Sequence, residues 1–404
     1  MDVILLRTVG LLVVAIIVAI IARRIHLPYT VGLVLTGIVL ALARIDTGVV
    51  LTRDIIFDGI LPPLLFEAAL NIRWSELRRD AVPVLTLAIL GVIISALVVA
   101  IGAANLLHWP VSSALIFGVL IAATDPVSVI AMFRDTGVKG RFRLLVESES
   151  LLNDGVAAVL FALVLGYAQA TGGESTTPAQ IAQALVLTAG GGTLVGLICG
   201  AGAIALAGQT TDHLVETALT MVAAYGSFLL AEQLHVSGVL ASVAAGLLMG
   251  NVGALHEREP SAPFFHRREF VMAFWDFAAF IANSFIFLLI GVSVAGISFA
   301  GLWPAALPII VVLVLIGRAL TVYPLCLMFA GSRWAIPVPA QHLLWWGGLR
   351  GALALALALA LPPSLTLRNE IVIATFGVVA FSVVVQGLTM SPLLKLLGLK
   401  PKRS

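Results

Sequence analysis

The residues best suited to chemistry occur in one short stretch, residues 146–155, with the sequence VESESLLNDG. The stretch opens a run that continues as VAAVLFALVLGYA and is long enough to cross a membrane, so its three carboxylates lie at the start of the apolar span or inside it. If the stretch is helical, Glu147, Ser150 and Asp154 share one face, because they occupy positions i, i+3 and i+7. A carboxylate deep in a bilayer costs roughly 2.5–3.5 kcal/mol, and such charges usually mark an ion or proton path. Carboxylate and hydroxyl oxygens are hard ligands, so the stretch predicts a cation- or proton-binding site.

A second candidate is the tripeptide Thr124-Asp125-Pro126, in the preceding apolar run. Proline lacks an amide donor and disfavours helix at the residue before it. Backbone carbonyls around Thr124 should therefore be free beside a carboxylate, which at membrane depth requires surrounding protein or a watery cavity. A simple proline kink with Asp125 in a salt bridge is the alternative. The presence of Asn153-Asp154 on the next span favours a shared ion site.

Asp154 is the leading candidate for a group that holds a proton and a cation in turn. Burial disfavours the charged form of a carboxyl group, so a proton can compete with a small cation for the same oxygens. Asn153 is neutral and adds no second titrating charge, which favours electroneutral exchange of one proton for one cation. The alternative is that Asp154 only neutralises a buried arginine.

Three of the other charged residues within apolar runs are further candidates. Glu67 is expected near the cytoplasmic end of its span, either as an outer ligand of the cation or as an interfacial charge. Arg318 and Arg350 need partners, because an unpaired guanidinium is costly in a membrane. Glu147 and Glu149 are the available acids. For both arginines, a structural pair that holds helices together competes with a direct role in transport, and we favour the structural role.

The composition indicates a polytopic helical membrane protein. The chain has 404 residues, of which 60% are hydrophobic and only 11% charged. A soluble protein would carry about 25% charged residues. Both cysteines lie in apolar runs, which indicates buried packing rather than a disulfide framework.

Apolar runs of helical length indicate thirteen transmembrane spans. They cover approximately residues 3–22, 29–45, 54–71, 82–105, 111–133, 144–169, 179–207, 213–232, 236–251, 269–296, 301–330, 338–361 and 369–394. With this count, most of the 23 basic residues fall on one side of the membrane. The positive-inside rule then places the N-terminus outside and the C-terminus in the cytoplasm. Apart from Arg318 and Arg350 inside spans, the basic residues on the other side are Arg7, Arg44, Arg53 and Arg368.

An odd number of spans suits two inverted six-helix repeats plus one extra helix. The fifth and twelfth spans would then correspond, and both are interrupted, at Thr124-Asp125-Pro126 and at residues 347–351 (GGLRG). Interrupted helices at matching places in two halves indicate the central site of a transporter.

Other function classes are less compatible with the sequence. No GxxxxGK[ST] motif is present, so we expect neither ATP-driven transport nor a nucleotide or nucleic-acid partner. A channel would need a continuous polar path, and a carbonyl-filter run is absent. A membrane enzyme that binds a metal at Asp125 and Asp154 lacks a supporting His or nucleophile constellation. A K⁺/H⁺ antiporter remains open, because residue types alone do not discriminate Na⁺ from K⁺.

Five motifs together resemble the monovalent cation–proton antiporter family, which includes bacterial sodium/proton antiporters and animal sodium/proton exchangers. In chain order they are ATDPVSVIAMF, ESESLLNDGVAAVLF, AEQLHVSGVLASVAAGLLMG, FIANSFIFLLIG and WWGGLRGALALALAL. The resemblance spans nearly the whole chain, and the TDP and SLLND motifs are its most specific parts. It implies a homodimer of thirteen-helix protomers in which two unwound helices cross within a core domain that moves against a dimer domain.

The resemblance also assigns roles to residues. It implies a Na⁺ site made by Asp125, Asp154, Ser150 and the main chain of Thr124, with Glu67 contributing through water. It implies that Glu149 pairs with Arg318 rather than with Arg350. Family members with Asp-Asp where this chain has Asn153-Asp154 are electrogenic, so the asparagine is consistent with electroneutral exchange and with a role in stabilising the crossing.

We therefore expect a secondary antiporter, not an enzyme, that exchanges protons for Na⁺ or Li⁺ by alternating access in the inner or plasma membrane. It should need no cofactor and no partner beyond the lipid bilayer and a second copy of itself. A single transmembrane domain should fill residues 1–404, without a cytosolic regulatory domain. Its core should include about 82–169 and 301–396, and its dimer or scaffold helices about 1–71 and 179–296.

Overall fold

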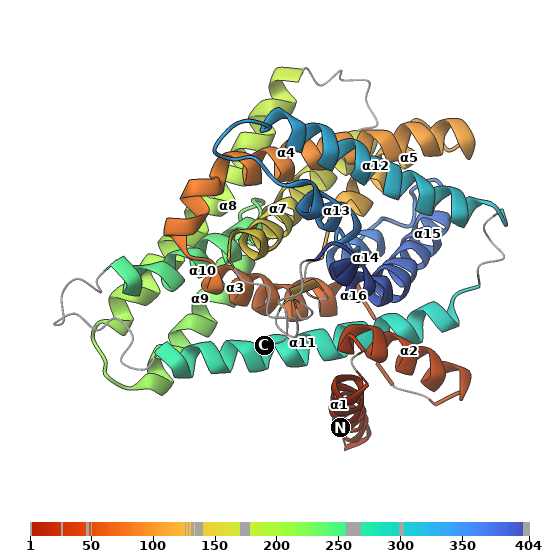
Figure 1. Ribbon diagram of the computed structural model, residues 1–404. Helices are drawn as coiled ribbons and strands as arrows, with labels where there is room; N and C mark the ends of the chain where they lie inside the picture. Colours follow the sequence, from red (N-terminus) through yellow and green to blue (C-terminus); the bar gives the residue numbers. More distant parts are fainter. Residues whose placement is uncertain are drawn as a thin grey trace. The chain divides into compact units, whose positions relative to one another are not determined.

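The structure, a computed structural model, has helices and no strands in the part of the chain that it describes (Figure 1). The described residues are 2–25, 27–45, 48–49, 51–125, 127, 129–130, 133, 140–169, 178–255, 268–298 and 303–398. Seven helices among them are long and apolar enough to cross a membrane. The predicted all-α membrane fold is therefore confirmed, whereas the count of thirteen and the inverted repeats remain predictions.

The chain divides into two compact units. The first comprises Met1–Ile56, Val82–Asn153 and Asn283–Ser404, and the second comprises Phe57–Ala81 and Asp154–Ala282. The assignment of a moving core and a dimer scaffold remains a prediction.

The first unit contains a set of short and long helices, several of which are broken within a predicted span. They are α1 (Asp2–Arg24), α2 (Tyr29–Leu42), α5 (Val111–Ala122), α12 (Ala306–Met328), α13 (Val338–Trp346), α14 (Ala352–Leu359), α15 (Arg368–Phe381), the π-helix η3 (Ser382–Gln386) and α16 (Gly387–Leu396). The second unit contains α3 (Leu61–Asn71), α8 (Pro178–Ala207), α9 (His213–Gln233) and α10 (Gly238–Leu255). Four elements contain a border between the units, namely η1 (Ile55–Ile60), α4 (Trp74–Leu106), α7 (Arg141–Gln169) and α11 (Arg268–Gly296).

Small residues let the helices of the second unit pack closely. A Cβ atom added to Gly196 of α8 would lie 2.1 Å from the carbonyl oxygen of Ala241 in α10. On α10, a Cβ on Gly250 would lie 2.3 Å from the carbonyl oxygen of Leu70 in α3. Such contacts are how transmembrane helices approach without large side chains between them. Helix α10 consequently packs against α8, α9 and α3.

The two predicted interruptions are confirmed, and both lie in the first unit. Helix α5 ends at Ala122. The next residue, Ala123, is extended (φ −56°, ψ 136°), and Val127 is again helical. The twelfth predicted span divides into α13, which ends at Trp346, and α14, which begins at Ala352. Proline at position 126 disfavours helix at Asp125, and the glycine-rich sequence of residues 347–351 weakens helix in the second break.

Candidate functional site

The two interrupted segments are hydrogen-bonded to each other. The backbone N–H of Asp125 donates to the carbonyl oxygen of Leu349 at 2.7 Å. The carboxylate of Asp125 accepts from the backbone N–H of Val127 at 2.9 Å. A Cβ atom on Gly351 would lie only 2.2 Å from that carboxylate, so a side chain at position 351 would displace it. The glycine is required by this close approach.

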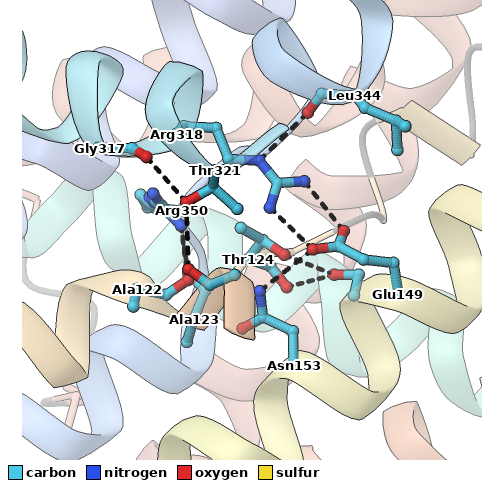
Figure 2. Close-up of polar contacts among 12 residues, drawn as sticks. Ala122, Ala123, Thr124, Glu149, Asn153, Gly317, Arg318, Thr321, Leu344 and Arg350 are labelled. Atoms are coloured by element: carbon cyan, nitrogen blue, oxygen red, sulfur yellow. Dashed lines mark hydrogen bonds and ion pairs between the residues drawn. The ribbon is translucent and has the colours of Figure 1, made fainter. Parts of the chain in front are cut away.

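Arg350 satisfies the end of the other broken helix. Its Nη1 atom donates to the carbonyl oxygens of Ala122 and Ala123, at 2.7 and 3.1 Å (Figure 2). The last carbonyls of a helix have no partner within the helix, and a cation is favourable at that end. The side chain is 1% exposed, so these bonds form away from lipid and water. Arg350 thus fixes the backbone that leads directly to Thr124 and Asp125.

Thr124 and Ser150 bring several oxygens together. The two hydroxyl groups lie 3.1 Å apart, and the Ser150 hydroxyl also donates to the Thr124 carbonyl. Both residues are 2% exposed. Because Ser150 belongs to α7 and Thr124 follows α5, the contact joins these two segments. The two hydroxyl groups can turn toward a small cation by side-chain rotation, and the Thr124 carbonyl adds a third oxygen beside them.

Glu149 and Arg318 form a bidentate ion pair between α7 and α12. The distances are 2.7 Å from Nη1 to Oε1 and 2.9 Å from Nη2 to Oε2. Arg318 also donates from Nε to the carbonyl oxygen of Leu344, at the end of α13, and Asn153 donates from Nδ2 to Glu149 at 3.4 Å. Figure 2 shows these side chains converging. The pairing implied by the family resemblance is present, and its contacts connect three helices.

A small cavity lies beside this ion pair. Thr124, Ser150, Glu149, Arg318 and Gly348 contribute to its lining, and it has room for about one water molecule. A Cβ atom on Gly348 would lie 2.6 Å from Nε of Arg318. The glycine therefore lets the guanidinium approach the backbone of the break.

The other predicted residues are Asp154, Glu67 and Glu147. Asp154 follows Asn153 in the same helix, one turn after Ser150, and is the first α7 residue assigned to the second unit. Glu67 lies in α3 of the second unit, where it accepts from Asn71 Nδ2 at 2.7 Å. Glu147, one of the two acids considered for the arginines, instead pairs with Arg143 at 2.7 Å.

Two residues that contact the site's backbone were not predicted. Ser382 and Gln386 of η3 bind the backbone on either side of the break between α13 and α14. A serine and a glutamine spaced i, i+4 in an otherwise apolar run are a recognisable signal. It was missed because neither residue carries charge and their partners lie far away in the sequence.

The fold and this site define a class of protein. Two broken helices that bind each other inside a membrane protein, with oxygens gathered at the break, are the features of a secondary transporter. Among the described residues, no group of three or more His, Cys, Asp or Glu side chains could hold a metal ion. The oxygens at the break come from hydroxyl and carbonyl groups and the single carboxylate of Asp125.

The comparisons with known proteins identify the family. Residues 11–396 match the family described as "Sodium/hydrogen exchanger, transmembrane", and the chain belongs to it. The chain is therefore a multi-pass membrane transporter of the monovalent cation–proton antiporter family and not an enzyme. It is 42% identical over 378 residues to the Na(+)/H(+) antiporter ApNhaP of Aphanothece halophytica, covering 93% of this chain and 70% of the relative.

Two further comparisons cover almost the whole chain. It is 35% identical over 404 residues to the Na(+)/H(+) antiporter NhaH of Halobacillus aidingensis, with 96% of each protein covered. The structure is similar to that of the sodium proton antiporter MjNhaP1 from Methanocaldococcus jannaschii, with a TM-score of 0.74. That match has 24% sequence identity and covers 98% of this chain and 100% of the other, so it supports the fold alone.

Proposed function

We propose that the chain exchanges Na⁺ or Li⁺ for protons across the membrane by alternating access. The observation that carries the proposal is the contact of Ser150 with Thr124 at the break after α5. There the Thr124 carbonyl and both hydroxyls meet. Asp125 is the next residue, and Asp154 lies one helical turn after Ser150 on α7. Membership of the exchanger family and the Na(+)/H(+) antiporters among its relatives support the choice of ions.

Asp154 is proposed to bind the proton and the cation alternately. Asp125, Ser150 and the Thr124 main chain supply the other oxygens around the cation, and Glu67 contributes through water. Protonation of Asp154 neutralises the charge that attracts the cation, so the two ligands exclude each other. No resident cofactor is needed, because both ligands are the transported ions.

The exchange is proposed to be electroneutral, with one proton for one cation. Asn153, the neighbour of Asp154, carries no charge in either step. Its bond to Glu149 supports a role in stabilising α7 beside the crossing. Glu149, Arg318 and Arg350 have structural roles in this scheme, since their bonds go to one another or to the backbone of the breaks.

We also propose an oligomeric state, a membrane and an orientation for the protein. The protein works as a homodimer in the inner or plasma membrane, with the N-terminus outside and the C-terminus in the cytoplasm. The distribution of basic residues supports this orientation.

The test is exchange in sealed proteoliposomes that contain a pH-sensitive dye. Na⁺, Li⁺ and K⁺ gradients should be applied in turn, and we expect proton movement with Na⁺ and Li⁺. Asp154→Asn should abolish the exchange while the purified protein stays folded. Glu147→Gln is the matched control. It removes a carboxylate from the same helix, and in the structure that carboxylate is paired with Arg143. If Asp154→Asn still exchanges protons for Na⁺, the assignment of the site is wrong.

A further inference from the structure

The break between α13 and α14 exposes backbone groups that need partners. Helix α13 ends at Trp346. The backbone N–H of Gly347 still donates to the Leu343 carbonyl, but the next helix begins only at Ala352. A buried backbone group without a partner is costly, more so at membrane depth. Partners for both sides of this break come from the π-helix η3, which lies between α15 and α16.

Ser382 and Gln386 connect the two sides of the break in one chain of bonds. Gln386 Nε2 donates to the carbonyl oxygen of Trp346 at 3.0 Å. The backbone N–H of Arg350 donates to the Ser382 hydroxyl at 2.8 Å, and that hydroxyl donates to Gln386 Oε1 at 2.7 Å. The pair therefore fixes the distance between the end of α13 and Arg350.

Both side chains are buried, and each of their polar atoms takes part in the bridge. Ser382 is 1% exposed and Gln386 is 4% exposed. The serine hydroxyl acts as acceptor and donor, and the glutamine uses both its oxygen and its nitrogen. A π-turn inside a longer helix is uncommon and frequently marks a functional position.

The bridge ends on the residues that hold the candidate ion site. Arg350 binds the carbonyls of Ala122 and Ala123, and Leu349 accepts from the backbone N–H of Asp125. A shift of residues 349 and 350 would move the backbone at Asp125, and with it the Thr124 carbonyl beside Ser150.

We propose that Ser382 and Gln386 are positioning residues that hold the break between α13 and α14, and through it Asp125 and the Thr124 carbonyl, in the geometry that binds the cation. This inference rests on the proposed cation–proton exchange. The two residues do not touch the cation themselves. Their loss should weaken cation binding more than it slows the exchange at saturating cation.

The experiment compares apparent KM for Na⁺, maximal rate and pH profile in proteoliposomes. Ser382→Ala leaves the Arg350 N–H without an acceptor, and Gln386→Met removes the donor to Trp346 with little change in volume. For each we expect apparent KM to rise about five- to tenfold, toward the low end of the effects seen when a buried hydrogen bond loses one partner. A cation that binds more weakly competes less well with protons. The pH of half-maximal exchange at fixed Na⁺ should therefore rise. Ser382→Thr keeps a hydroxyl and should restore values near those of the unchanged protein.

The matched control is Thr375→Ala. Thr375 is a fully buried hydroxyl residue of α15, and its hydroxyl donates within its own helix, to the Ile371 carbonyl at 2.7 Å. It should lower the melting temperature without changing the KM for Na⁺. The inference is overturned if Ser382→Ala and Gln386→Met behave like Thr375→Ala, with unchanged KM and pH profile. That result would leave the proposed function intact, because Asp154→Asn tests it independently.

Discussion

The guanidinium of Arg318 and the carboxylate of Glu149 face each other in a bidentate pair, and both side chains are buried, at 6% and 2% exposed. The pair connects α12 to α7, and Arg318 also donates from Nε to the Leu344 carbonyl oxygen near the end of α13. Thr124 and Ser150 line the same small cavity as the ion pair. The ion pair therefore holds together the helices that border the candidate site.

Removal of one member of this pair should destabilise the protein strongly. Glu149→Gln leaves a buried guanidinium without its counter-charge, a change that costs about 3–5 kcal/mol in buried pairs. We expect a large loss of thermal stability in detergent and a low yield of folded protein. Arg318→Lys should be intermediate, because lysine keeps the charge and loses the planar fork.

The control for this prediction is the neighbouring pair of Arg143 and Glu147, which is less buried, at 28% and 12% exposed. Glu147→Gln should cost about 0–1 kcal/mol, as pairs nearer the surface do. Equal losses of stability for Glu149→Gln and Glu147→Gln would contradict the special role of the pair with Arg318.

A methyl group at position 351 should disrupt the candidate site directly. The Cβ atom in Gly351→Ala would lie 2.2 Å from an Asp125 carboxylate oxygen, so the carboxylate or the crossing backbone must move. We expect exchange to fall at least about tenfold, since misplacement of about 1 Å in a functional site has large effects. Gly166→Ala is the control, because nothing lies within 4 Å of the added atom on α7. Normal exchange by Gly351→Ala would show that Asp125 is not held as the structure describes.

The sequence predicts where the two helices break, but it does not predict the hydrogen-bond partners of the residues at the breaks. Proline after Asp125 and the glycines around Arg350 are local signals, and the structure has its irregular backbone at both places. The hydrogen-bond partners of Arg350 were not predictable. An argument from charge pairs a buried arginine with a carboxylate, whereas Arg350 donates to the carbonyl oxygens of Ala122 and Ala123. Such acceptors exist only after a helix has ended, and any residue type supplies them.

The pair of Ser382 and Gln386 illustrates the same limit. Two uncharged polar residues in an apolar span predict an interhelical contact but not its partner. Their partners are backbone groups of Trp346 and Arg350, which become available only through the break. The acidic and hydroxyl residues of the candidate site, by contrast, were visible because charge in an apolar span is rare.

Asn153→Asp should change the charge balance of exchange. A carboxylate at this position would stand beside Glu149, to which the Asn153 amide now donates at 3.4 Å. The lost donor and the like charge both favour protonation of the new side chain, so a second proton can enter the cycle. We expect a changed pH profile and a dependence of exchange on membrane potential. The measurement is exchange in proteoliposomes with the potential clamped by K⁺ and valinomycin. A pH profile and potential dependence identical to those of the unchanged protein would argue against electrical coupling at this position.

Competition between protons and Na⁺ should appear as a pH-dependent KM with a constant maximal rate. If a single group binds either ligand, the proton-bound form is withdrawn from cation binding as the pH falls. By mass action, apparent KM for Na⁺ should then rise about tenfold for each pH unit once protonation dominates. On the alkaline side it should become independent of pH, because the group is already deprotonated. Saturating Na⁺ should recover the same rate at every pH within this range, since enough cation displaces the proton. If the maximal rate decreases as the pH is lowered while KM stays constant, protons act at a group separate from the cation site. Asp154 would then not be the shared ligand.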